Sequence, residues 1–252
     1  MGILTHIRAI GIILFLILLL PPGNSPAGEM DVVTEIWPPF RIADPGQNQD
    51  LTGIDIDLLE MLSRRLGVPY TIRRMPWARC LEFMRTGEAD LITGLAHTEE
   101  RARYIRYSEI PYHTVFPAFY VRKGDADRIR TYEDLASFTI GYSLRSAYFE
   151  PFDSDTRLNK YGVSTERQLL RMLAAGHLFV IIGTDANVAY DIANLGLREK
   201  VERARYQPDQ HTDLYVGISR ASRLVERSEE IDRHLKEIVR NGLLLRYLEK
   251  YF

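Results

Sequence analysis

Apolar residues along the chain follow two different spacings, which predict helices and strands in alternation. In one early run every fourth residue is apolar, at Ile54, Leu58, Leu62 and Leu66. This spacing places the four side chains on one face of a helix, and Gly67 fits the left-handed residue at which many helices end. A second helix is predicted over 77–86, closed by Gly87. The tail from 222 to 252 is expected to be mostly helical, with an apolar face formed by Ile231, Leu235, Ile238 and Val239.

Short apolar runs between the helices predict strands that are buried in a sheet. In the first half of the chain the expected strands are 31–37, 70–75, 91–93 and 115–121. A second set begins after Asp125, with strands at 138–143, 179–182 and 214–219. Strands that alternate with helices favour α/β layers with parallel pairing, and two similar sets suggest two lobes.

Polar residues with the spacing of helix caps divide the second set. Thr131 with Asp134, and Thr165 with Gln168, each predict the start of a helix, because such pairs satisfy free amide groups in the first turn. Gly183-Thr184-Asp185 is expected to open a further helix directly after a buried strand.

The first 27 residues have the layout of a secretory signal peptide. Residues 1–8 carry one arginine and no acid, 9–20 form an apolar run, and 25–27 are small residues suited to cleavage. The alternative is a transmembrane anchor, but the apolar run is shorter than the ~20 residues that a spanning helix needs. No cysteine follows the run, so a lipid anchor is not expected. We therefore expect export to the periplasm.

Composition excludes several classes of protein. About 225 residues remain after the predicted signal, enough for one large domain or two small lobes. A net charge of −2 gives no reason to expect a nucleic-acid partner. Cys80 is the only cysteine, which rules out an internal disulfide and fits a small buried side chain on a helix. The six histidines lack metal-ligand spacing and no nucleotide-binding glycine motif is present, so neither a metal nor a cofactor is expected.

Residues 90–112 are the most informative segment for function. An apolar run ends at Gly94, a short polar segment presents Arg101, and a stretch with Ser, Pro and Tyr follows. A guanidinium just beyond the end of a buried strand is well placed to hold a carboxylate through two parallel hydrogen bonds. The alternative is that Arg101 is one charge on a solvated helix.

Five short motifs follow one another along the chain. They are Glu35-Ile-Trp37-Pro-Pro-Phe40; Gly53-Ile-Asp55-Ile-Asp57-Leu58; Met75-Pro76-Trp77-Ala-Arg79 with Gly87-Glu-Ala-Asp90; Thr98-Glu-Glu-Arg101; and Ser108-Glu-Ile-Pro111-Tyr112. None is specific alone. In this order, behind a signal peptide, they resemble the family 3 extracellular solute-binding proteins, the periplasmic polar amino-acid-binding proteins of ABC importers.

The resemblance implies an α/β fold of the two-lobed type II periplasmic binding class, in which each lobe is a mainly parallel sheet flanked by helices. Lobe 1 would be discontinuous, formed by 28–120 plus 215–252, and lobe 2 would span 121–214. Ligands of such folds bind beyond the carboxyl ends of strands, where backbone amides and helix N-termini face a crevice. A solute that touches both lobes would favour the closed form, because only that form makes both sets of contacts.

The resemblance also implies ligand contacts for individual residues. Arg101 would pair with a carboxylate, and backbone groups of Gly94 and Ala96 would add hydrogen bonds. Ser146, at a helix N-terminus in lobe 2, would donate to the same carboxylate. Asp185 would accept from an α-ammonium. Either of the last two side chains could instead serve only as a helix cap.

Two tryptophans and two departures from the family pattern complete the expected site. Trp37 and Trp77 would form apolar walls with a cation–π contribution, although Trp77 could equally belong to the core. Ala96 stands where a hydroxyl is usual, which removes a donor. Arg145 stands where glycine is frequent, which puts a cation at the cleft mouth unless it points to solvent. A dicarboxylate, an acidic amino acid or a peptide-like solute is therefore an alternative to an ordinary α-amino acid.

We expect a monomeric, non-enzymatic periplasmic receptor that closes around an amino-acid-like or other small carboxylate-bearing solute and serves an ABC permease. One alternative is a periplasmic enzyme of the cyclohexadienyl dehydratase type, which eliminates water from a cyclic acid. Such an enzyme needs a general acid, for which Glu35, Glu150 and His97 are the candidates. The other alternative is a ligand-sensing module without a transport role.

Overall fold

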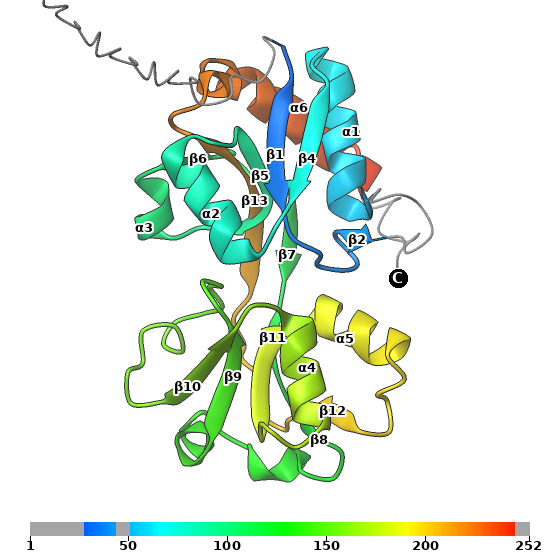
Figure 1. Ribbon diagram of the computed structural model, residues 1–252, viewed down its shortest axis with the longest axis vertical. Helices are drawn as coiled ribbons and strands as arrows, with labels where there is room; N and C mark the ends of the chain where they lie inside the picture. Colours follow the sequence, from blue (N-terminus) through cyan, green and yellow to red (C-terminus); the bar gives the residue numbers. More distant parts are fainter. Residues whose placement is uncertain (1–27, 44–50, 245–252) are drawn as a thin grey trace, which may run out of the picture.

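The computed structural model describes residues 28–43 and 51–244, which form two large β-sheets set one above the other (Figure 1). A small ribbon of β2 (Ile42–Ala43) and β3 (Leu51–Thr52) accompanies them. The predicted signal peptide and the end of the predicted helical tail lie outside the described residues.

The first sheet combines parallel and antiparallel pairing. Its strand order is β4 (Tyr70–Arg74), β1 (Met30–Thr34), β5 (Leu91–Ala96), β13 (Thr212–Ser219) and β6 (Ile105–Tyr107), with β7 (His113–Val115) also paired to β13. The strand β1 runs parallel to both of its neighbours, whereas β13 is antiparallel to the three strands that it pairs with. Parallel strands need a crossover connection, which here contains a helix.

The second sheet repeats this plan. Its order is β10 (Asn159–Val163), β9 (Thr139–Ser143), β11 (Val180–Thr184), β8 (Pro117–Arg122) and β12 (Val201–Arg203). The strand β9 is parallel to both neighbours, and β8 is antiparallel to β11 and β12.

The longer helices lie in segments where periodicity or cap residues predict a helix. They are α1 (Ile54–Leu66), α2 (Trp77–Thr86), α4 (Glu166–Ala174), α5 (Asp185–Asn194) and α6 (Ser228–Arg240). The first two match the predicted bounds residue for residue. Each ends at the expected glycine in the left-handed region, Gly67 at φ 65° and Gly87 at φ 78°. A short α3 (Glu99–Ala102) follows β5, and 3₁₀ turns lie at Ala126–Arg128, Glu133–Ser137 and Arg223–Arg227.

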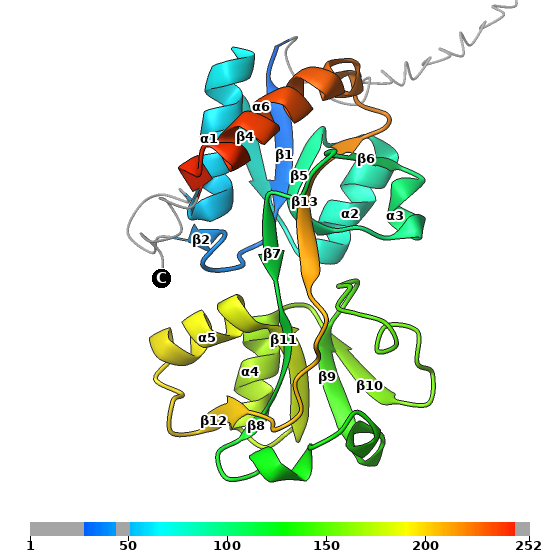
Figure 2. The same ribbon diagram turned by 180° about the vertical axis from the view of Figure 1, so that it is seen from behind.

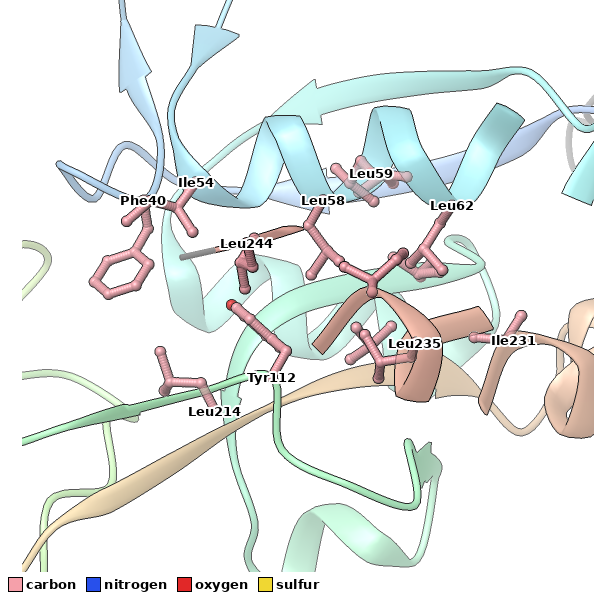
Figure 3. Close-up of a cluster of buried hydrophobic side chains, with 14 of the residues drawn as sticks. Phe40, Ile54, Leu58, Leu59, Leu62, Tyr112, Leu214, Ile231, Leu235 and Leu244 are labelled. Carbon is pink, nitrogen blue, oxygen red and sulfur yellow. The ribbon is translucent and has the colours of Figure 1, made fainter. Parts of the chain in front are cut away.

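Helices cover both faces of the first sheet because its strands are apolar on both sides. In β1, Val32 packs into the cluster formed with α1 and α6, whereas the next residue, Val33, packs into the cluster formed with α2. Consecutive strand residues point to opposite faces, so one continuous apolar run serves both helix layers. In Figure 3, Leu58 and Leu62 of α1 face Leu235 of α6 across this core.

The second sheet is covered by helices on one face and by aromatic side chains on the other. Tyr120 of β8 packs with the apolar side chains of α4 and α5. Its neighbour Phe119 lies on the opposite face, with ring centroids 6.3 Å from Phe149 and 5.8 Å from Phe152. Each sheet is therefore the middle layer of its own lobe, which confirms the predicted two-lobed α/β fold.

The chain passes between the two sheets in two places (Figure 2). The strand expected over 115–121 is divided, because β7 ends at Val115 in the first sheet and β8 begins at Pro117 in the second. Phe116 lies between them and is 55% exposed. The return runs from β12 to β13. The lobe boundaries 28–120 plus 215–252, and 121–214, stay a prediction.

Local side chains organise the helix starts of the second lobe. Thr165 caps α4 as predicted, its hydroxyl accepting from the Gln168 amide at 3.1 Å. The segment that begins at Thr131 forms a 3₁₀ turn, in which the Asp134 carboxylate accepts from the amides of Arg130 and Thr131 at 2.8 and 3.0 Å. The spacing therefore predicted one half of a capping box but not the type of helix.

Candidate functional site

A cavity of about 190 Å³ lies between the two sheets. Its walls are built by residues at or just after the carboxyl ends of strands from both lobes: Glu35 and Trp37 after β1, Ala96 at the end of β5, Ser146 after β9 and Thr184 at the end of β11. This is the edge at which α/β sheets bind ligands, because the connecting loops and helix N-termini meet there.

Six of the eight residues expected to touch a ligand line this cavity. They are Trp37, Trp77, Gly94, Ala96, Arg101 and Ser146. They come from four separate parts of the sequence, which the fold brings together. Their roles toward a ligand remain proposals. The predicted helix N-terminus at Ser146 is wrong, because Ser146 lies in a loop and no helix is present among the described residues between β9 and β10.

Arg101 is a buried cation without an acidic partner among the described residues. Its side chain is 6% exposed and donates to two backbone carbonyls, that of Ala96 at 2.9 Å and that of Arg145 at 2.5 Å. The guanidinium carbon lies 5.9 Å from the Trp77 ring centroid. Burial lowers the pKa of Arg101, because leaving water disfavours the charged form. A carboxylate entering the cavity would supply the missing counter-charge.

Gly94 belongs to a crowded part of the cavity wall. Its φ is 71°, and a Cβ built there would lie 2.3 Å from Nη1 of Arg41. Arg41 is fully buried and pairs with the carboxylate of Asp55, which also accepts from Thr93 Oγ1 at 2.9 Å and Tyr112 Oη at 2.7 Å. Only glycine fits both this backbone conformation and this space. No pattern in the sequence signals the Arg41–Asp55 network, since Arg41 follows one motif, Asp55 stands in another and neither position indicates a pair.

The two tryptophans hold different positions. Trp37 stacks on Phe40 at 4.6 Å between ring centroids, and its Nε1 donates across the cavity to Oε2 of Glu166 at 3.2 Å. Trp77 is 5% exposed and packs in the core between β1 and α2 while also lining the cavity. Trp77 therefore belongs to the core and also lines the cavity, and its contact with a ligand stays a prediction.

Glu166 is the prominent cavity residue that sequence analysis missed. As the first residue of α4 it resembles an ordinary solvated acid in a first turn, which gives no signal of burial. The structure turns it inward, where Oε1 accepts from the Thr184 amide at 2.9 Å and from the Thr184 hydroxyl at 3.2 Å. Burial raises the pKa of Glu166 to about 8, and the nearby Glu35 adds to the rise.

Glu35 is the second acid of the cavity. Burial raises its pKa to about 7, opposed in part by the positive charge of Arg41. Of the three acids considered for catalysis, only Glu35 lines the cavity. Glu150 is exposed and accepts from Ser154, and His97 is exposed and packs on the ring of Tyr107 at 4.6 Å.

Asp185 and Arg145 do not line the cavity. The Asp185 carboxylate accepts from Tyr120 Oη at 2.9 Å and pairs with Arg203. Its neighbour Thr184 faces the cavity instead, because consecutive side chains at the end of a strand point to different sides. The Arg145 side chain, 55% exposed, reaches Glu100 of lobe 1 at 3.0 Å.

Direct contacts close the two lobes over the cavity. Nδ2 of Asn187 donates to the Pro38 carbonyl at 2.6 Å, which joins α5 to the loop after β1. The Trp37–Glu166 hydrogen bond and the contacts of Arg101 and Arg145 described above also cross between lobes. The structure is therefore a closed arrangement, held by polar contacts on the rim and inside.

Within 28–43 and 51–244, no group of three His, Cys, Asp or Glu side chains is placed to hold a metal ion. No helix in this part of the chain is both long and apolar enough to span a bilayer.

Comparison with known sequences points to the same family that the sequence motifs resemble. The profile of the bacterial extracellular solute-binding proteins, family 3, matches residues 30–252. The L-cystine-binding protein TcyA of Bacillus subtilis (strain 168) is 22% identical over 226 residues, covering 89% of this chain and 81% of that protein.

Solved structures share the fold. An amino acid ABC transporter substrate-binding protein, AbpA of Streptococcus pneumoniae, bound to L-arginine, superposes with a TM-score of 0.78 at 22% identity, covering 89% of this chain and 94% of that one. The ancestral amino acid-binding protein AncCDT-1, a precursor of cyclohexadienyl dehydratase, gives a TM-score of 0.74 at 24% identity over 89% and 96% of the two chains. At these identities the likeness establishes the fold.

Proposed function

Because the chain belongs to the bacterial extracellular solute-binding proteins of family 3, we propose that it captures an amino-acid-like or other small carboxylate-bearing solute by closure of its two lobes. The proposal includes export to the periplasm by residues 1–27, action as a monomer and delivery of the solute to an ABC permease. Members of this family are extracellular or periplasmic solute-binding proteins.

The observation that carries the proposal is the unpaired charge of Arg101. A guanidinium has five N–H donors in a planar fork suited to a carboxylate. In this cavity they meet two backbone carbonyl oxygens and the hydroxyl group of Tyr107, all of which are neutral. A buried charge without a counter-charge is costly, so binding a carboxylate there would be strongly favourable.

The size of the cavity supports a single small solute. The cavity has a volume of about 190 Å³. Pockets for drug-sized ligands begin at about 300 Å³, so the closed cavity favours a molecule of amino-acid size over a peptide. The contacts between lobes support capture by closure, because they can form only when the lobes approach each other.

The test begins with a thermal-shift screen of the proteinogenic amino acids, L-cystine, succinate, glutarate and adipate. A ligand that binds only the folded protein raises its melting temperature. Calorimetry with the best ligand is then repeated on Arg101→Ala. We expect its affinity to fall at least about 30-fold, since truncating one partner of a buried charge pair costs about 2–5 kcal/mol.

Arg103→Ala is the matched control, because Arg103 is exposed and stands two residues from Arg101. It should bind as the unmodified protein does. Equal loss of affinity in both variants, or unchanged affinity in Arg101→Ala, would remove Arg101 from the site.

A second function is favoured by one specific observation. Glu35 and Glu166 are cavity acids that keep a large protonated fraction near neutral pH, which is the property a general acid needs. AncCDT-1 is described as a precursor of a dehydratase on this fold. Incubation with prephenate or arogenate, followed by ultraviolet absorbance, distinguishes the two functions: turnover that is lost in Glu166→Gln or Glu35→Gln would establish the enzyme, and no turnover would reject it.

A further inference from the structure

Arg145 holds a backbone conformation that side chains rarely adopt. Among the residues that the structure describes, it is the one residue other than glycine with a positive φ, at 65°. It is the third residue of a turn, which the Ser146 amide closes by donating to the Ser143 carbonyl at 3.1 Å. Type II turns require this conformation at that position and usually fill it with glycine. A residue with a Cβ adopts it at a cost, which persists only where surrounding contacts hold the chain in place.

Two contacts hold Arg145, and both come from lobe 1. Its backbone carbonyl accepts from Nη2 of Arg101 at 2.5 Å, and its own Nη2 donates to Oε1 of Glu100 at 3.0 Å. Glu100 and Arg101 are neighbours in the short helix α3. One short segment of lobe 1 therefore holds one residue of lobe 2 by its backbone and by its side chain. Glycine would take the same turn more easily but could make only the backbone contact.

The two contacts differ in their exposure to solvent. Arg101 is 6% exposed, so salt has little access to its hydrogen bond with the Arg145 carbonyl. The side chains of Arg145 and Glu100 are 55% and 64% exposed, so salt screens the ion pair between them. The connection between the lobes at Arg145 therefore has a buried part that is insensitive to salt and an exposed part that salt weakens.

The contact with Arg145 leaves room for a carboxylate on Arg101. A guanidinium has five N–H donors, and the carbonyls of Ala96 and Arg145, together with the Tyr107 hydroxyl, engage three of them. Two donors remain for a solute. The contact and the binding of a carboxylate are therefore compatible, and the contact needs no solute in order to form.

We propose that Arg145 is a latch that stabilises the closed form of this protein before any solute is bound. The proposed function assigns closure to the solute, whereas this inference assigns part of it to contacts of the chain with itself. Contacts that exist only in the closed form shift the equilibrium between the open and closed forms toward closure. Because the cavity lies between the lobes, opening it to admit or release a solute breaks both contacts of Arg145.

The experiment measures the ratio of closed to open protein without solute. The protein is unfolded in urea and refolded, so that no carried-over solute remains. Spin labels on Thr86→Cys in lobe 1 and Glu133→Cys in lobe 2, two exposed positions, report the distance between the lobes by double electron–electron resonance. Cys80 is fully buried, and burial raises its pKa to about 12, so it stays unlabelled at pH 7. The closed form is identified by the label distance that corresponds to this structure.

Substitutions in the labelled protein test the exposed part of the latch. Arg145→Gln keeps a side chain in the turn and removes its charge, so the ratio of closed to open protein should fall about two- to fivefold, as expected for an exposed ion pair. Glu100→Gln should have the same effect, and the double variant should lose no more than either single variant, because both changes remove one ion pair. Exchange of the two charges, Glu100→Arg with Arg145→Glu, should restore closure.

Salt and one further variant separate the two parts of the latch. Raising NaCl from 50 mM to 1 M should lower the ratio in the unmodified protein and leave it unchanged in Arg145→Gln. Arg101→Ala removes the buried contact and should lower the ratio at least about tenfold at both salt concentrations, because hydrogen bonds to charged groups are the stronger ones. Arg64→Gln is the matched control, since Arg64 and Glu60 form an exposed ion pair within α1, and it should change nothing.

Three results would overturn the latch. They are an unmodified protein that is open throughout, an unchanged ratio in Arg145→Gln, and exchanged charges that fail to restore closure. Because the measurement contains no solute, these results do not depend on whether the protein binds a carboxylate. The calorimetry of Arg101→Ala described above tests that function separately, so the two proposals can fail independently.

Discussion

Replacing Glu166 with glutamine should flatten the pH dependence of the stability of this protein. The buried carboxyl group holds its proton more tightly in the folded protein than in the unfolded chain, because burial in the cavity disfavours its charge. Above the ordinary pKa the unfolded chain therefore binds fewer protons than the folded protein. The free energy of unfolding must fall as the pH rises from about 4.5 to about 8.

The size of the effect follows from the two pKa values. Glu166 titrates near 8 when folded and near its ordinary value of 4.5 when unfolded. At about 1.36 kcal/mol for each pKa unit, this gap corresponds to about 5 kcal/mol of stability lost across the interval. Most single domains have only about 5–15 kcal/mol in total, so the effect is large enough to measure. Glutamine does not titrate, so the variant lacks this contribution.

The assay is urea denaturation at constant ionic strength between pH 5 and pH 9, followed by tryptophan fluorescence. The quantity compared is the difference in free energy of unfolding between the unmodified protein and Glu166→Gln at each pH. Lost hydrogen bonds to Thr184 or Trp37 shift this difference by a constant, whereas the titration changes it with pH. We expect the variant to gain about 4 kcal/mol relative to the unmodified protein between pH 5 and pH 9, because part of the loss already occurs below pH 5.

Glu133→Gln serves as the control, because an exposed glutamate should follow the curve of the unmodified protein. Curves for Glu166→Gln that run parallel to those of the unmodified protein would refute the reasoning. They would mean that Glu166 titrates normally in the folded protein and that the cavity does not exclude water from it.

Three further substitutions test the packing that supports the site, each by urea denaturation. Gly94→Ala places a side chain in a left-handed conformation 2.3 Å from Arg41 and should lower the free energy of unfolding by more than about 2 kcal/mol. The control Gly196→Ala, at φ 65° with open space, should lower it by about 1 kcal/mol. Equal losses in the two variants would contradict the clash. Asp55→Ala leaves Arg41 buried and unpaired and should cost about 3–5 kcal/mol; a loss below 1 kcal/mol would contradict a buried pair. Leu235→Ala opens a cavity between α6 and α1 and should cost about 2–5 kcal/mol, and a smaller loss would show that the core collapses around it.

The sequence alone determined the elements whose signals are local. The apolar spacing of α1, its terminal Gly67 and the Thr165 cap of α4 each involve residues within a few positions of one another. Backbone geometry and amide satisfaction act over the same short range, so a pattern in the chain is enough to predict them. Arg101 also belongs here, because a motif places it directly beyond a buried strand.

The tertiary structure decided which side chains meet. Glu166 and Trp37 are 129 positions apart, and no local pattern indicates that a first-turn acid turns inward to accept from an indole. Thr184 faces the cavity, whereas the next residue, Asp185, does not. Which of the two side chains faces the cavity depends on the position of β11 in its sheet. The break at Phe116 likewise arises because the strands on its two sides belong to different sheets. Burial and counter-charge depend on atoms brought together from distant segments, so only the folded arrangement sets the electrostatics of the cavity.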